Sequence, residues 1–368
     1  MKTMNLKRQI RRLLALEWVS AFRPASAVWV LLLVHRGFSL AEIGLAEGIF
    51  HLVSLFGEVP SGVFSDLTGR KRALAMGQIL LGLSAMTMLL SKSMAGICVG
   101  MAFSALGCNM ASGTREAITY DSLLQAGEEA GYLTLSSKQN VIYRLAQAAA
   151  TLCAGLTVAV GWRVGYGADV GLAAAGAALA LALTEPVINC AKAQDAGSRT
   201  VLSRLQTHRR ETGKFLKDHP RMVVVMLLNA AVGTCATLLA FYLQHGLSKA
   251  GAPDLLMGPL LLLVGLGGAV GSKLAPRLTA LRYGASGALC CGGVAVGFLL
   301  VASGLFPLMA LGGFLAVACD DAFQLLTDAR LNQGIPSEQR ATLLSYSSLS
   351  FSLVMVISSP LAGLAVSA

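Results

Sequence analysis

Charged residues are scarce in this sequence. Aspartate, glutamate, lysine and arginine together make up 13 % of its 368 residues, whereas a soluble domain carries roughly a quarter. Hydrophobic residues account for 55 %, and the mean hydropathy is +0.66. This composition excludes an ordinary soluble domain and predicts an all-α polytopic membrane protein.

Motifs of enzymes and metal sites are also missing. The sequence has no P-loop and no Ser/His/Asp or HExxH spacing, and its eight cysteines show no CxxC or Cys/His ligand spacing. The string Gly265-Leu-Gly-Gly-Ala-Val-Gly271 resembles a nucleotide-binding fingerprint, but it lies in an apolar run without βαβ context, so close helix packing explains it better. We therefore expect no enzyme activity, no cofactor, no metal and no drive by ATP.

Long apolar runs dominate the chain instead. Each has about 20 residues, which is enough to cross the hydrocarbon core as a helix. Arg23 and Pro24 interrupt the first run just before Ala25-Ser-Ala27, so we expect an uncleaved first span rather than a signal peptide. About eleven spans are predicted, near 13–34, 40–64, 73–91, 95–120, 139–160, 168–189, 221–245, 255–275, 284–303, 306–328 and 341–366.

The net charge of +10 follows the positive-inside pattern. With the N-terminus in the cytoplasm, most lysines and arginines fall on the inner side, and no basic soluble module with interleaved aromatics exists that would suit a nucleic acid. We expect a multi-pass protein of the inner (cytoplasmic) membrane whose C-terminus, after an odd number of spans, is external. The basic residues outside the inner side are Arg36, Lys92, Arg163 and Lys249 in outer loops and Arg23, Arg115 and Arg144 in spans.

One long polar break divides the spans six and five. The predicted domains are an N-terminal bundle over 1–189, a cytoplasmic linker over 190–221 and a C-terminal bundle over 222–368. The two halves look like diverged copies. Gly62 matches Gly271, Tyr120-Asp121 matches Thr327-Asp328, and the offset between the halves is nearly the same for both matches. Parallel repeats of this kind build transporters with a site between the halves.

A loop motif makes the resemblance to a family specific. Gly62-Val-Phe-Ser-Asp66-Leu-Thr-Gly69-Arg70-Lys71 resembles the major facilitator superfamily motif Gly-x-x-x-Asp-Arg-x-Gly-Arg-Lys, and only Leu67 departs from it. The stretches 112–121 and 335–345 also resemble bacterial members. The resemblance covers essentially the whole chain and implies two pseudo-symmetric helix bundles. The family usually has twelve spans, so the final, peripheral helix is absent here.

The motif is predicted to form a cytoplasmic gate. Gly62 lets two helices approach closely and Gly69 permits a tight reversal, while Asp66 accepts hydrogen bonds from a helix N-terminus and Arg70 pairs with an acid such as Asp121. The alternative is that Arg70, Lys71 and Arg72 only signal the orientation of the chain in the membrane, as any basic loop would. The predicted gate residues are Gly62, Asp66, Gly69, Arg70, Lys71 and Asp121.

Charges inside spans cost about 2.5–3.5 kcal/mol each, so they are paired or face water. The resemblance implies that the first, fourth, seventh and tenth helices line the cavity. Glu58, before Pro60, is either a proton site or a partner for backbone donors freed at the proline. We expect Glu17 to be structural and His51 to be packed. The candidate proton or substrate site comprises Arg23, Glu58, Arg115, Glu116, Asp320 and Asp321.

Two interpretations of these charges stay open. Glu116 with Asp320 or Asp321 could carry a coupling proton, with Arg23 as a partner whose movement switches their proton affinity. Equally, Arg23 and the acids could form a fixed structural pair. Adjacent residues lie about 100° apart on a helix, so Arg115 and Glu116 cannot both point squarely into a cavity.

The predicted function is secondary active transport by rocking of two bundles. Proton-coupled efflux of drugs or small organic compounds is our first hypothesis. The alternatives are a permease for uptake of a small metabolite and a transport-inactive membrane protein, since Ala275 replaces the aspartate in the second-half loop. The expected partners are a small-molecule substrate, protons and the lipid bilayer, with no nucleic acid, and we expect a monomer.

Overall fold

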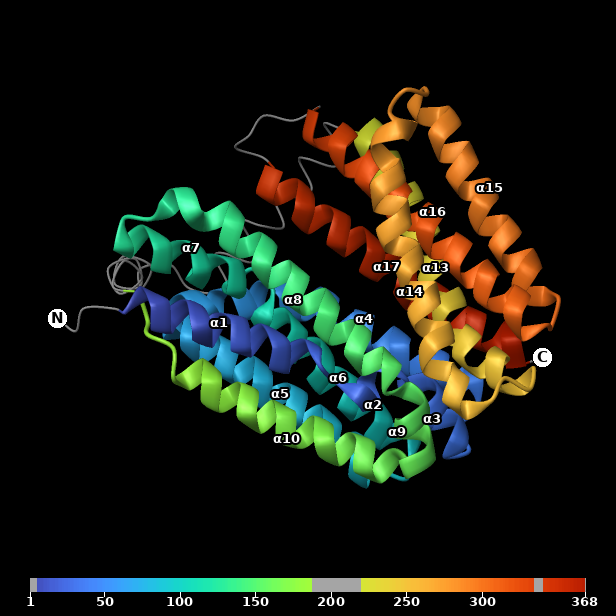
Figure 1. Ribbon diagram of the computed structural model, residues 1–368, viewed down its shortest axis with the longest axis horizontal. Helices are drawn as coiled ribbons and strands as arrows, with labels where there is room; N and C mark the ends of the chain where they lie inside the picture. The colour runs from blue at the N-terminus through green and yellow to red at the C-terminus, as the bar shows by residue number, and fades with distance from the viewer. Residues whose placement is uncertain (1–4, 187–219, 334–339, 368) are drawn as a thin grey trace. The chain divides into compact units, whose positions relative to one another are not determined.

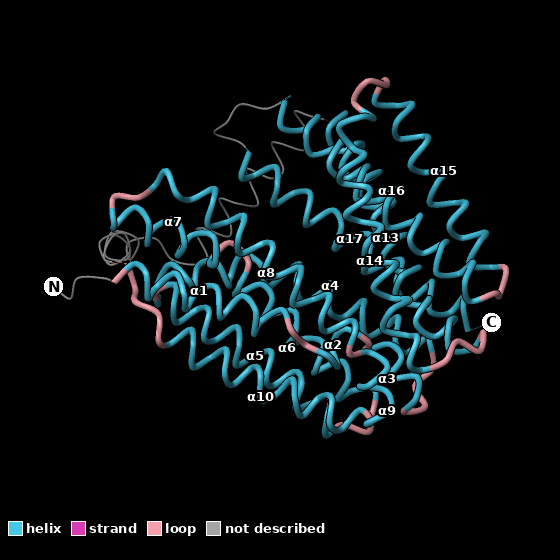
Figure 2. Tube along the Cα trace, in the orientation of Figure 1, coloured by secondary structure: helices cyan, strands magenta, loops and turns pink. Residues whose placement is uncertain are grey.

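The computed structural model describes residues 5–186, 220–333 and 340–367 (Figure 1). Figure 2 shows that these residues form helices joined by turns, without a strand. The helices are α1 (Leu6–Ala21), α2 (Pro24–Ala27), α3 (Trp29–His35), α4 (Leu40–Thr68), α5 (Arg70–Leu90), α6 (Met94–Ala111), α7 (Thr114–Ala126), the 3-10 turn η1 (Glu129–Gly131), α8 (Tyr132–Leu152), α9 (Ala154–Val160), α10 (Trp162–Leu181), α13 (Pro220–Lys249), α14 (Asp254–Leu278), α15 (Tyr283–Ala302), α16 (Phe306–Gln333) and α17 (Arg340–Ser367).

The all-α fold predicted from composition is confirmed for the described residues. Nine helical segments of the described residues, one of them α6 joined with α7, are long and apolar enough to cross a membrane. The count is ten if the bent pair formed by Glu129–Leu152 and α9 is one span. The count differs from the predicted eleven mainly at 13–34, where the chain forms three short helices, α1, α2 and α3, instead of one.

The break in this first span has a local cause. The backbone N–H of Phe22 still donates to Trp18 at 2.9 Å, which closes α1, and α2 then begins at Pro24. Proline has no N–H to continue the ladder of α1, but its fixed φ suits the first position of a new helix. Arg23 therefore lies between two helices rather than within one.

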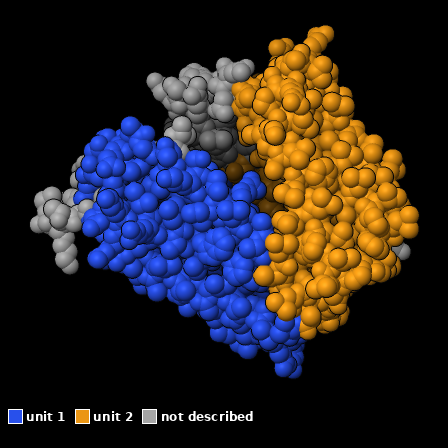
Figure 3. Space-filling model, in the orientation of Figure 1, with its two compact units in different colours: residues 1–27, 52–150, 160–209 blue, residues 28–51, 151–159, 210–368 orange. Residues whose placement is uncertain are grey.

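The described chain clusters into two compact units, coloured separately in Figure 3. Unit 1 comprises Met1–Ala27, Leu52–Ala150 and Val160–Arg209, and unit 2 comprises Val28–His51, Thr151–Ala159 and Arg210–Ala368. Two segments of the predicted N-terminal bundle thus belong with the later helices. The division into 1–189 and 222–368 stays a prediction, and nearly all of the predicted linker over 190–221 lies outside the described residues.

In unit 1, α5 packs between α6 and α10. The buried core includes Leu13 and Leu16 of α1, Leu74 of α5 and Ile118 of α7. These side chains come from helices far apart in the sequence. Their packing holds α1, which precedes the break in the first span, against α5, which follows the loop motif.

In unit 2, α16 packs against α13, α14 and α15. A Cβ at Gly267 would collide with the carbonyl oxygen of Phe314, and one at Gly271 with that of Ala318, both on α16. The prediction that the glycine string 265–271 serves close helix packing is therefore confirmed. Phe323 of α16 is fully buried in the adjoining core.

Candidate functional site

The loop motif lies where α4 ends and α5 begins. Gly69 adopts φ +96°, a conformation that L side chains rarely reach, so the predicted glycine-dependent reversal is confirmed. Nη2 of Arg70 lies 3.1 Å from Oδ2 of Asp121 on α7, and both side chains are largely buried. This is the ion pair that the sequence predicts.

The helix N-terminus in this loop is capped by a residue that the sequence analysis missed. Oε1 and Oε2 of Glu185 accept the backbone N–H groups of Arg70 and Lys71, each at 2.8 Å. A carboxylate is favourable there because the first N–H groups of a helix lack intrahelical partners and the dipole is positive. The sequence signal is an acidic residue near the end of the predicted span 168–189, whose helix α10 ends at Leu181 in the structure.

Gly62 and Asp66 of the predicted gate are both exposed on α4, and the first backbone N–H groups of α5 bind Glu185. A Cβ built at Gly62 would meet no atom within 4 Å, so the close helix approach predicted there is absent from the described structure. The gate role of both residues stays a prediction, because a gate changes its contacts between conformations.

Arg115 of α7 is paired rather than free. Its Nη1 lies 2.5 Å from Oε1 of Glu17 on α1, and its guanidinium lies 5.6 Å from the ring centroid of Tyr143. Glu17 is 3 % exposed, which agrees with the structural role expected for it. Glu116 is exposed, as the 100° step between adjacent helix positions requires once Arg115 faces Glu17.

Arg23 is held in a buried polar cluster at the break of the first span. Its guanidinium donates to Oε1 of Gln78 at 3.3 Å and to the carbonyl oxygen of Ser20 at 3.3 Å. Gln78 in turn donates to the hydroxyl of Ser20 at 2.7 Å, and Gly176 of α10 leaves the space that Gln78 occupies. The cluster satisfies a cation that is 9 % exposed.

Asp169 of α10 is the acid of this cluster, and the sequence analysis missed it. Its carboxylate accepts from the N–H and hydroxyl of Ser26 at 3.1 and 2.8 Å and from the N–H of Ala25 at 3.4 Å, and it interacts electrostatically with Arg23. Asp169 is fully buried. Glu116, the predicted partner of Arg23 in this unit, is not part of the cluster. The cost argument applied to Arg23 also predicts an acid in a span, and it would have found Asp169.

Asp320 and Asp321 of α16 face two different helices of unit 2. A Cβ at Gly233 of α13 would lie 3.4 Å from Oδ1 of Asp320, whereas one at Gly268 of α14 would collide with the carboxylate of Asp321. Both aspartates are half-buried. The missing side chain of Gly268 therefore makes the room in which Asp321 lies.

Glu58 is half-buried in α4, which carries Pro60. The hydroxyl of Ser61 donates to the carbonyl oxygen of Glu58 at 2.8 Å. This hydrogen bond involves the backbone of Glu58 and not its carboxylate. The carboxylate can therefore still be either a proton site or a partner for backbone donors freed at Pro60.

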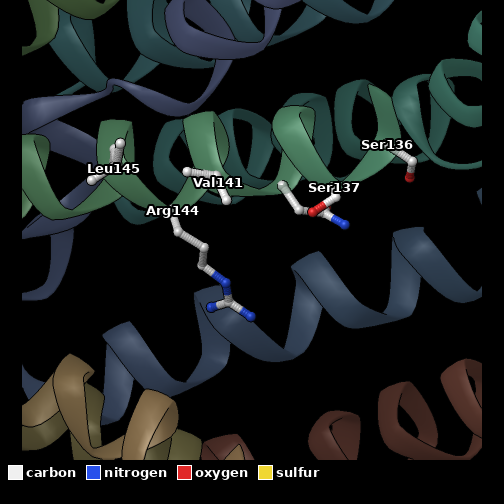
Figure 4. Close-up of a pocket in the computed structure, with 6 residues that line it drawn as sticks. Ser136, Ser137, Val141, Arg144 and Leu145 are labelled. Atoms are coloured by element: carbon white, nitrogen blue, oxygen red, sulfur yellow. The ribbon is translucent and has the colours of Figure 1, made fainter. Parts of the chain in front are cut away.

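An open surface hollow of about 440 Å³ lies along α8, and all six residues that line it belong to this helix. Figure 4 shows Arg144 extending away from this helix, with Val141 and Leu145 beside it and Ser136 and Ser137 further along. Arg144 is exposed although it lies within a predicted span. A cation facing hydrocarbon costs about 2.5–3.5 kcal/mol, so the exposure of Arg144 favours contact with water on this side of α8.

The sequence and the fold were compared with those of known proteins. The family model described as Major Facilitator Superfamily matches residues 19–320. No functionally curated protein matches the sequence. The nucleoside transporter NupG has a similar structure, with a TM-score of 0.77 at 15 % identity, covering 99 % of this chain and 91 % of that one.

Two further solved structures are similar. A bacterial homolog of the human lysosomal transporter Spinster gives a TM-score of 0.69 at 15 % identity, covering 96 % of this chain and 81 % of that one. The xylose transporter XylE from E. coli gives 0.61 at 15 % identity, covering 97 % and 88 %. At such identities the likeness concerns the fold.

Proposed function

The chain belongs to the Major Facilitator Superfamily and is a secondary transporter, and we propose that it exports small organic compounds across the cytoplasmic membrane in exchange for protons. Transport follows alternating access, in which bundles 1–189 and 222–368 rock about a central site, joined by a cytoplasmic linker over 190–221. The protein acts as a monomer, with its N-terminus cytoplasmic and its C-terminus external.

The observation that carries a transport pathway is the hollow along α8. Arg144 is exposed in this open hollow, beside the polar side chains of Ser136, Ser137 and Asn140. Val141 and Leu145 lie on the same side, so the lining combines one cation with apolar surface. Such a lining suits an amphipathic organic compound better than a strongly hydrated metabolite.

Proton coupling is assigned first to Asp320. Among the described residues no lysine or arginine forms an ion pair with this half-buried carboxylate. A carboxylate without a cation in a poorly solvated place is poised to exchange a proton. Asp321, Glu116 and then Glu58 are the further candidates. Arg23, hydrogen-bonded to Gln78 and Ser20 and under the electrostatic influence of Asp169, fits a fixed structural role better than that of a moving partner.

The gate of the proposed cycle is the loop motif. The pair Arg70–Asp121 and the cap by Glu185 hold α5, α7 and the segment after α10 together at one end of unit 1. We propose that Asp66 binds a helix end while the cytoplasmic side is closed. Lys71, whose N–H is already capped, adds positive charge to the inner loop.

The second candidate function is uptake of a small metabolite. The similarity to a nucleoside transporter and to a xylose transporter favours it. A transport-inactive protein is the third candidate. Inverted and right-side-out vesicles with an imposed pH gradient separate the three, because accumulation occurs only in inverted vesicles for export, only in right-side-out vesicles for uptake, and in neither for an inactive protein.

A thermal-shift screen identifies the compound for these assays. A ligand that binds the folded state raises the unfolding midpoint, by about 2.7 kcal/mol of stability at a concentration 100 times its Kd. Export is supported if amphipathic organic compounds shift the midpoint and Arg144→Gln removes the shift. A midpoint that responds only to sugars or nucleosides contradicts it.

A further inference from the structure

Glu47 and His51 form a buried acid–imidazole pair in unit 2. They lie four positions apart on α4, with Nε2 of His51 3.2 Å from Oε1 of Glu47. The residues are 6 % and 7 % exposed. Nδ1 of His51 lies 3.4 Å from the hydroxyl of Ser352 on α17, and its ring packs edge-on against Phe351. The packing expected for His51 is therefore present, but together with a carboxylate.

The pair lies in a tight helix interface. A Cβ at Gly44 of α4 would collide with the carbonyl oxygen of Ser359 on α17, and one at Gly48 would lie 3.1 Å from Cγ of Pro360. The hydroxyl of Ser359 donates to the carbonyl oxygen of Gly44 at 3.0 Å. Backbones this close leave little space for water beside the pair.

Few charges face the pair from the neighbouring helices. From α13, the titratable group that interacts with Glu47 is Tyr242, whose hydroxyl also donates to the carbonyl oxygen of Ser359 at 3.4 Å. The stretch 348–367 of α17 contains no titratable residue. Among the described residues Glu47 forms no ion pair with a lysine or arginine.

This arrangement makes the net charge of the pair depend on one proton. With the imidazole neutral and the carboxylate ionised, the pair carries one negative charge, and binding a proton at His51 brings it to zero. A buried net charge is costly, whereas a neutral hydrogen-bonded pair is tolerated. Proton binding therefore favours the packed interface, and proton loss favours a state in which water reaches the pair.

We propose that Glu47 and His51 form a proton-binding site that controls whether α4 stays packed against α17 and α13. For its role in transport the site rests on the proposed function, since it would be one place where the driving proton acts. As a proton-controlled contact it stands independently of any substrate.

Trp29 offers a readout that needs no substrate. It belongs to unit 2, and its ring lies edge-on to Phe241 of α13, 5.7 Å between centroids. In the purified full chain with Trp18→Phe and Trp162→Phe, acrylamide quenching reports how accessible Trp29 is. We expect the quenching constant to rise about twofold between pH 5 and pH 8.

Substitutions at the pair make the test sharp. Glu47→Gln changes the two charge states from minus one and zero to zero and plus one, so quenching should fall rather than rise with pH. Glu47→Gln combined with His51→Asn removes both titrating groups and should give no pH dependence. His245→Asn, a half-buried histidine of α13, and Glu42→Gln, at the start of α4, are matched controls that should keep the original profile.

The outcomes separate this site from the proposed function. A flat profile in the parent protein, or a profile unchanged in the double variant, overturns the proton site. If the double variant does not fold, the direction of the profile in Glu47→Gln decides alone. If the profiles behave as expected but pH gradients drive no transport, the site stands and proton-coupled export fails.

Discussion

Glu185 closes the first turn of the helix that begins at Arg70, by accepting that residue's backbone N–H at 2.8 Å across 115 positions of sequence. Its second carboxylate oxygen does the same for Lys71. The loop between α4 and α5 is thus fixed from three sides, by the Gly69 reversal, by the Arg70–Asp121 pair and by a cap from the segment after α10.

The cap predicts a measurable stability loss. Replacing Glu185 with alanine removes both hydrogen bonds and the favourable charge at the dipole, and should destabilise the protein by about 1–2 kcal/mol. The midpoint of thermal unfolding in detergent measures the change, and Glu185→Gln should fall between the parent and alanine. Glu129→Ala, an exposed acid of the turn η1, is the control that should leave the midpoint in place.

Asp66 should matter for transport and not for folding. It is exposed in this structure, so Asp66→Asn should leave insertion and the unfolding midpoint unchanged. If Asp66 holds the cytoplasmic side closed in another conformation, vesicle transport should fall at least about tenfold, which corresponds to 1.4 kcal/mol of lost preference. Transport at the parent rate from a normally produced variant would leave the motif as a loop-orienting signal only.

The cluster at the first span's break predicts a rescue. Asp169→Asn removes the negative charge that acts on buried Arg23, and Arg23→Gln removes the cation, so each should destabilise the protein by about 1–3 kcal/mol. The two substitutions together remove both charges and should recover much of the loss. Yield and unfolding midpoint report it. Losses that simply add in the double variant would show that the two residues do not act as a pair.

The C-terminus is predicted to be external. The predicted eleven spans from a cytoplasmic N-terminus require it, provided that α1, α2 and α3 together cross the membrane once and that α17 crosses completely. A C-terminal reporter that is active only in the cytoplasm should be silent, and the same reporter inserted near residue 200 of the predicted linker should be active. A bright C-terminal signal would mean that the span count or the N-terminal placement is wrong.

The sequence predicts this molecule well where local chemistry decides. Hydropathy alone is enough to predict a helical membrane protein. The loop motif predicts both the reversal at Gly69 and the Arg70–Asp121 pair. Arg23 and Pro24 interrupt the first apolar run in the sequence, and the structure has a break there. The sequence predicts one continuous span, whereas the structure has the three helices α1, α2 and α3.

Contacts between distant segments were not predictable in the same way. Glu185 and Asp169 bind backbone groups more than 100 positions away, and no spacing in the sequence encodes such a partner. Gly62 shows the reverse error, because its small size predicts a close helix contact that the described structure lacks. A single sequence gives the cost of a buried charge but not the identity of the group that offsets it.

The coupling residues can be identified by replacing one titratable carboxyl group at a time. Glu116→Gln, Asp320→Asn and Asp321→Asn each keep the shape of the side chain while abolishing its titration. A coupling residue should lose accumulation driven by a pH gradient yet retain substrate exchange, because exchange needs no net proton movement. A structural residue should instead lose yield and thermal stability together.

The structure orders these three variants. Asp320 faces Gly233 of α13 without a described cation, so Asp320→Asn should lose gradient-driven transport at least about tenfold and keep exchange. Asp321 fills the space over Gly268, so its substitution should also lower the unfolding midpoint. Glu116 is exposed and should affect transport only if it faces the pathway. If all three variants keep gradient-driven transport, the coupling proton is carried elsewhere, and Glu58→Gln and Glu47→Gln become the deciding measurements.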